Sequence, residues 1–71
     1  MDSFRERIKY CREVEGMTQK EVADFLKISP RAYQRYESGD RKPSYDVVLK
    51  LCRLYGVSTD FLFGMVEIEY D

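Results

Sequence analysis

The chain has 71 residues, 44% hydrophobic and 35% charged, with 12 Lys+Arg against 13 Asp+Glu and a net charge of −1. This length and composition predict one soluble globular domain with a small core, not a disordered or fibrous segment. Histidine is absent and the two cysteines stand alone, so neither a zinc site nor the usual acid–base and nucleophilic chemistry can be assembled. No apolar run has the length of a membrane span or of a signal-peptide core. We therefore expect a cytoplasmic, non-enzymatic protein with no metal, cofactor, small-molecule ligand or membrane partner.

Helix start and stop signals alternate along the chain. Hydroxyl residues suited to N-capping stand at Ser3, Thr18, Ser29, Ser44 and Ser58. The first two are followed by Glu6 and Glu21 at the spacing of a capping box, and Pro30 follows Ser29 at the first helical position. The four glycines fall where these helices should end. The signals predict five helices, over residues 3–15, 18–26, 29–38, 44–55 and 58–63.

Apolar residues within these helices keep helical spacing, which predicts one compact all-α bundle. The expected core residues are Phe4, Ile8, Cys11, Val22, Ala23, Leu26, Val48, Leu51, Cys52, Tyr55, Phe61 and Leu62. Both cysteines lie within these stripes, so we expect them to be buried as small hydrophobic residues. The bundle occupies residues 1–64 as one domain.

Residues 65–71 form a tail with a different pattern. Val66, Ile68 and Tyr70 alternate with acidic residues, which is the period of a strand. No other segment of the chain has this period, so the tail either pairs with another chain, as in a dimer, or is frayed.

The predicted second and third helices are joined by about three residues, 27–29, which is the length of the turn in a helix-turn-helix. At about 100° per residue, Arg31, Gln34, Arg35 and Ser38 share one arc of the third helix. Arginine and glutamine are the side chains that bind guanine and adenine in a bidentate manner in the major groove. The alternative is a solvated charged face of no special function.

The distribution of charge along the chain favours the base-reading interpretation. Residues 27–43 hold five Lys/Arg against two Asp/Glu, whereas residues 1–26 hold five against six and residues 44–71 hold two against five. The positive charge is thus concentrated on the third helix and the loop after it, as in a local nucleic-acid footprint.

The stretch from Arg7 to Gly64 resembles the phage-repressor/Cro-like (Xre-type) helix-turn-helix family. The resemblance is carried, in order, by residues 16–19 (GMTQ), 21–23 (EVA), 36–39 (YESG), 42–44 (KPS), 49–51 (LKL), 56–58 (GVS) and 61–64 (FLFG). Each motif is weakly specific alone, but their order and spacing together are strongly specific.

The resemblance implies roles for individual residues. Gln19 would contact a backbone phosphate and support the recognition helix, and Ala23 would let the two helices approach. Arg12 and Glu37 would form an ion pair between the first and third helices; the alternative is two unrelated surface charges. Base-facing positions would be Ser29, Pro30, Arg31 and Arg35, with Gln34 beside them, and the phosphate clamp would be Arg41, Lys42, Ser44 and Tyr45.

The chain departs from the family at two positions. Lys27 stands where the family commonly has glycine. If the turn is left-handed, the backbone of this lysine would be strained, because a Cβ atom disfavours that conformation. Pro30 brings no side-chain donor, so it can make only apolar contact, for example with a thymine methyl.

Two functions follow from these patterns. The first is a sequence-specific regulator of transcription, a repressor that binds a pseudo-palindromic operator in double-stranded DNA as a homodimer. The second is an adaptor that uses the same fold to bind a protein, although the two aligned arginines would then have no purpose.

Overall fold

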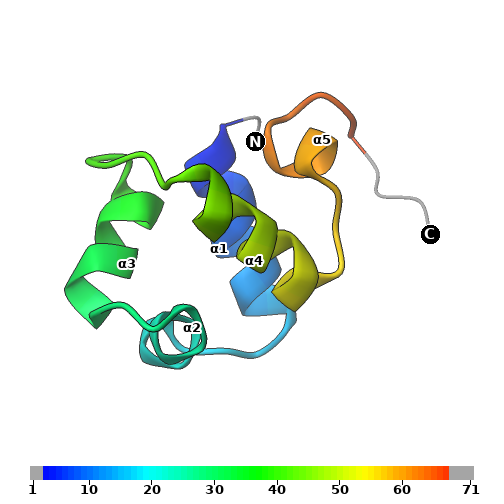
Figure 1. Cartoon of the computed structure of the whole chain (residues 1–71). Coiled ribbons are helices and arrows are strands. Elements are labelled where there is room, and N and C mark those ends of the chain that lie inside the picture. Colours follow the sequence, from blue (N-terminus) through cyan, green and yellow to red (C-terminus); the bar gives the residue numbers. More distant parts are fainter. Residues whose placement is uncertain (1–2, 68–71) are drawn as a thin grey trace.

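The computed structural model describes residues 3–67 and contains five helices in that range (Figure 1). They are α1 (Phe4–Val14), α2 (Gln19–Leu26), α3 (Pro30–Ser38), α4 (Tyr45–Tyr55) and α5 (Thr59–Leu62). The predicted all-α bundle with a central helix-turn-helix is therefore confirmed. The predicted bounds differ mainly because they included the capping residues.

Each helix begins at the hydroxyl residue that the sequence indicated. Ser3, Thr18, Ser29, Ser44 and Ser58 all have extended backbones and accept a hydrogen bond from an N–H in the first turn. Both predicted capping boxes are present, with the Glu6 and Glu21 carboxylates accepting from the backbone N–H of the cap. These bonds satisfy donors that a helix start would otherwise leave without a partner.

The turn between α2 and α3 ends α2 in a left-handed residue. Lys27 has φ 60° and ψ 42° and donates its N–H to the carbonyls of Ala23 and Asp24. It is the one residue other than glycine with positive φ in the described part of the chain. The turn thus keeps the geometry that favours glycine, with a lysine in its place.

The core lies where α1, α2, α3, α4 and α5 meet, and most of the expected residues are buried in it. Cys11 is 5% exposed, as expected, but Cys52 and Phe4 are only half-buried and pack against the buried cluster from outside it. Tyr33 and Tyr36, on the side of α3 opposite the polar arc, are buried, as its helical period predicts, whereas Arg7 lies outside the expected core and is among the most buried side chains.

Arg7 joins α1 to the end of the described chain. Its Nη1 donates to the carbonyl oxygens of Phe61 at 3.0 Å and Val66 at 2.6 Å, and its guanidinium lies 4.6 Å from the centre of the Phe61 ring. Glu67 lies 3.7 Å from Nη2. Val66 and Glu67 belong to no strand, and the rest of the predicted strand, Ile68 to Tyr70, lies outside the described residues.

The helix-turn-helix and the last helix lie at opposite ends of the molecule (Figure 1). The pair α2 and α3 forms one end, and α5 with the segment after it lies at the other. Within residues 3–67, no helix is long and apolar enough to cross a bilayer.

Replacing Lys27 with glycine should stabilise the protein, because glycine adopts positive φ without a steric penalty. We expect the free energy of unfolding to rise by up to about 1 kcal/mol, seen as a higher melting temperature. Gly56, at φ 67° with open space around it, gives the opposite control: Gly56→Ala should lower the melting temperature. A lower melting temperature in Lys27→Gly would mean that the lysine side chain stabilises the turn.

Candidate nucleic-acid interface

One face of α3 is exposed along its whole length. Arg31, Gln34, Arg35 and Ser38 are all exposed, whereas Tyr33, on the opposite side, is buried. The four exposed residues and Asp40 line a shallow hollow of about 330 Å³. Two guanidinium groups and an amide therefore share one accessible surface, with the geometry that the helical period predicts.

Ser29 and Pro30 form the N-terminal end of this exposed face. The Ser29 hydroxyl accepts a hydrogen bond from the Ala32 N–H at 3.1 Å, so its acceptor function is used as the helix cap. No acceptor within residues 3–67 takes up its O–H donor, which can therefore bond an outside group. Pro30 follows as the first helical residue, and both residues are exposed.

The loop from α3 to α4 presents two more cations. Arg41 and Lys42 are exposed, and the Arg41 N–H donates to the Arg35 carbonyl at 3.2 Å, which ties the loop to α3. Ser44 then caps α4, and Tyr45 on the first turn is 74% exposed. A helix N-terminus with exposed hydroxyls and neighbouring cations is suited to a phosphate.

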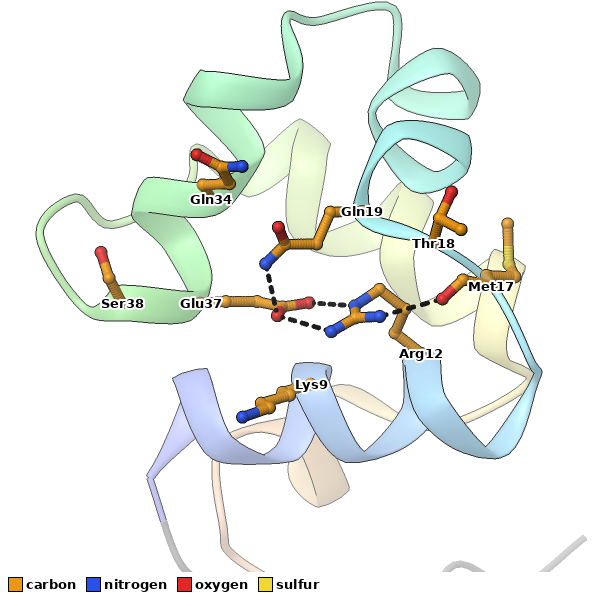
Figure 2. Close-up of a pocket in the computed structure, with 8 residues that line it drawn as sticks. All are labelled: Lys9, Arg12, Met17, Thr18, Gln19, Gln34, Glu37 and Ser38. Atoms are coloured by element: carbon orange, nitrogen blue, oxygen red, sulfur yellow. Dashed lines mark hydrogen bonds and ion pairs between the residues drawn. The ribbon is translucent and has the colours of Figure 1, made fainter.

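The carboxylate of Glu37 joins three helices beneath the exposed face of α3 (Figure 2). Arg12 of α1 donates from Nε to Oε2 at 2.7 Å and from Nη2 to Oε1 at 3.1 Å, a bidentate pair. Gln19 of α2 donates from Nε2 to Oε1 at 3.1 Å. Arg12 Nη1 also donates to the Met17 carbonyl at 2.9 Å, which fixes the α1–α2 connection.

This cluster is buried and balanced in charge. The side chains of Arg12 and Glu37 are 13% and 5% exposed. Burial alone would raise the pKa of Glu37, but the hydrogen bonds from Arg12, Tyr33 and Gln19 outweigh it and lower the pKa below the ordinary value. The hydrogen bond to Glu37 outweighs desolvation and raises the pKa of Arg12. Both groups are therefore charged at neutral pH.

A tyrosine pair extends the cluster into the core. The hydroxyls of Tyr33 on α3 and Tyr55 on α4 lie 3.1 Å apart. Burial, with hydrogen bonds to Glu37 and Tyr55, raises the pKa of Tyr33 far above its usual range, and burial raises the pKa of Tyr55 to about 12. Both hydroxyls stay protonated, so polar contacts hold α3 against α4 as well.

A second hollow, of about 690 Å³, opens between α1, the start of α2 and α3 (Figure 2). Its lining includes Lys9, Gln19, Gln34 and Ser38, and the last two also line the first hollow. The two hollows are therefore neighbours on the surface of α3.

The start of α2 lines the second hollow through Thr18 and Gln19 and has open backbone donors. Within residues 3–67 no acceptor bonds the backbone N–H groups of Gln19 and Lys20, the first two residues of α2. The Gln19 amide has a second hydrogen besides the one donated to Glu37. This helix start can bind an anion such as a phosphate.

The predicted site residues therefore lie in three groups. Ser29, Pro30, Arg31, Gln34 and Arg35 lie along α3, Arg41, Lys42, Ser44 and Tyr45 lie in the following loop and helix start, and Gln19 lies at the start of α2. The sequence analysis did not single out Lys9. A signal was present, because Lys9 lies four residues after Arg5 and the two cations therefore share one face of α1.

Comparison with known proteins identifies the family of this arrangement. The profile of the helix-turn-helix family matches residues 8–62, which is most of the chain. The chain belongs to the helix-turn-helix family.

Named relatives agree with this assignment. The chain is 41% identical over 68 residues to the SPbeta prophage-derived uncharacterized HTH-type transcriptional regulator YonR of Bacillus subtilis, covering 96% of this chain and 63% of YonR. It is 44% identical over 67 residues to the HTH-type transcriptional regulator ImmR of the same species, covering 94% of this chain and 53% of ImmR. The chain thus spans between half and two thirds of the length of these relatives, whose names describe regulators and not enzymes.

Solved structures share the fold. The P22 c2 repressor, in complex with a synthetic operator, superimposes with a TM-score of 0.80 at 22% identity, over 87% of this chain and 94% of that chain. A transcriptional regulator from Listeria innocua superimposes with a TM-score of 0.84 at 24% identity, over 100% of this chain and 67% of that one. The fold is therefore of the phage-repressor type.

The lowered pKa of Glu37 predicts a specific loss of stability in acid. Its contribution is fully present above about pH 4.5, the ordinary glutamate value, and is lost as the pH falls through the lowered folded-state pKa. Glu37→Gln should lower the free energy of unfolding at neutral pH by about 3 kcal/mol, since it breaks a mostly buried pair. The same substitution should also make the free energy of unfolding decline less steeply as the pH falls.

Denaturant unfolding from pH 2 to pH 7 measures both effects. Glu13→Gln, at an exposed position of α1, serves as the control and should run parallel to the wild type. An acid decline of equal steepness in Glu37→Gln and wild type would show that Glu37 does not titrate with unfolding.

Proposed function

We propose that the protein is a sequence-specific regulator of transcription, a repressor that binds double-stranded DNA through the major groove. The observation that carries the proposal is the exposed arc of α3, where Arg31, Arg35 and Gln34 share one surface and the Glu37 cluster fixes the helix behind them. Relatives named as transcriptional regulators support it.

Base reading falls to the side chains of this arc. Arg31 and Arg35 can each bind guanine O6 and N7, and Gln34 can bind adenine N6 and N7. Pro30, at the start of α3, offers apolar contact to a thymine methyl. Ser29 retains a hydroxyl donor beside it.

Phosphate contacts lie on both sides of the arc. Gln19 and the open N–H groups at the start of α2 form one, and Arg41, Lys42, Ser44 and Tyr45 form the other. Such contacts position the protein on the duplex, whereas the contacts of α3 specify the sequence.

A homodimer on a pseudo-palindromic operator completes the proposal. Exposed apolar side chains gather after α5, with Phe63 53%, Met65 73% and Val66 36% exposed. This segment lies at the opposite end of the molecule from α3 (Figure 1), so a second copy could pack there and leave α3 accessible. Two recognition helices about 34 Å apart would then match half-sites one helical turn apart.

The adaptor function would use apolar surface elsewhere, such as the exposed Phe25 on α2. It gives no role to the two arginines on α3, which a protein-binding module would not need. We therefore favour DNA as the partner, with residues 1–64 as the DNA-binding domain and residues 65–71 as the tail.

Selection from random duplex DNA at physiological salt tests the proposal. An enriched inverted repeat with half-sites about 10 base pairs apart supports a dimeric sequence reader. A pool that stays random would contradict it.

On the selected operator, Arg31→Ala and Arg35→Ala should each weaken binding by about 1–3 kcal/mol and relax preference at one base pair. Lys42→Ala should weaken binding to all sequences alike and reduce the salt slope by about one unit. Quantitative binding to single-base operator variants measures these effects. Uniform losses in all three variants would show that the arginines contact phosphate only.

Removing residues 65–71 should weaken the dimer, as measured by sedimentation mass. Because truncation also removes the Val66 carbonyl bound by Arg7, the full-length variant Val66→Glu is the matched test. It places a charge on the apolar surface and keeps the backbone contact. An unchanged dimer in both variants would exclude the tail from the interface.

A further inference from the structure

We propose that α1 also contacts DNA, with Lys9 binding a backbone phosphate in the hollow between α1, α2 and α3. This inference rests on the proposed function and extends the interface beyond the helix-turn-helix. Its first support is position: Lys9 is exposed and lines the hollow together with Gln19, Gln34 and Ser38. Figure 2 shows Lys9 on α1 below the Glu37 cluster, on the side of α1 that faces α3.

The charge of the hollow points to an anion. Two of its ionisable groups, Arg12 and Glu37, neutralise one another in the bidentate pair. Lys9 is the remaining ionisable group in the lining, and it forms no ion pair with a carboxylate of residues 3–67. The hollow therefore carries one uncompensated positive charge.

The donors around Lys9 suit a phosphate oxygen. Gln19, whose amide has a second hydrogen besides the one donated to Glu37, lines the same hollow together with Thr18, the cap of α2. Gln34 and Ser38 connect the hollow to the one beside Arg31 and Arg35. A strand of the duplex whose bases meet α3 would thus pass its backbone over Lys9.

A second cation continues this edge of α1. Arg5 lies one turn before Lys9, and its side chain packs over Gly39 at the end of α3, where a Cβ would come within 2.8 Å of Arg5 Cδ. The exposed loop cations Arg41 and Lys42 follow directly after Gly39 and Asp40. Arg5 therefore adds a cation where α1 meets the end of α3, next to the loop that carries Arg41 and Lys42.

A purely structural role would also place cations here. The C-terminus of α3 carries partial negative charge, and Lys9 and Arg5 near it would stabilise the fold. The two roles differ in what they change: a phosphate contact alters the salt dependence of DNA binding, and a structural role alters the melting temperature.

The test compares Lys9→Gln with Arg53→Gln, which removes the same charge from an exposed site at the far end of α4. Arg53 lies eight residues beyond Tyr45, about 12 Å along the helix. Binding to a mixed-sequence duplex and to the selected operator is measured over a range of salt concentrations, together with the melting temperature. Lys9→Arg, which keeps the charge, should bind like the wild type.

We expect Lys9→Gln to reduce the slope of log K against log salt by about 0.9, equivalent to about eightfold weaker binding at 0.1 M salt. The loss should be equal on both duplexes, because a phosphate contact carries no sequence information. Arg53→Gln should leave the slope nearly unchanged.

An unchanged slope in Lys9→Gln, or an equal change in Arg53→Gln, would overturn the inference and leave the proposed function standing. A wild-type protein that binds neither duplex would overturn both.

Discussion

The fold depends on one buried carboxylate. Glu37 on α3 accepts hydrogen bonds from Arg12 of α1 and Gln19 of α2, and so fixes three helices at one point. A buried charge left without its partner is costly, so this contact demands a single arrangement of the helices. That arrangement turns the opposite face of α3, with Arg31 and Arg35, towards solvent.

The same contact links the fold to the interface. Gln19 donates one amide hydrogen to Glu37 and retains another at the surface of the second hollow. The residue that supports α3 is thus also placed to meet a phosphate. A rigid α3 with flanking donors is what base reading requires, because misplaced bidentate contacts lose their specificity.

Local signals made most of the fold predictable. A hydroxyl at each helix start and glycine at most helix ends are short-range features, and the structure has helices at all five places. The periodicity also placed Arg31, Gln34, Arg35 and Ser38 on one exposed arc. What the sequence could not reveal depends on tertiary contact. The hollow beside Lys9 exists only once α1 packs against α3, and the burial of Arg7 follows from carbonyl groups more than fifty residues away.

We infer that one surface, formed by α3, the starts of α2 and α4 and the exposed side of α1, faces DNA. Amide NMR spectra recorded while the selected operator duplex is added test it directly. We predict that the shifts concentrate at residues 18–20, 29–38 and 41–45 and around Lys9, and that the second half of α4 stays unchanged. Shifts confined to the segment after α5, or none at all, would show that DNA does not contact this surface.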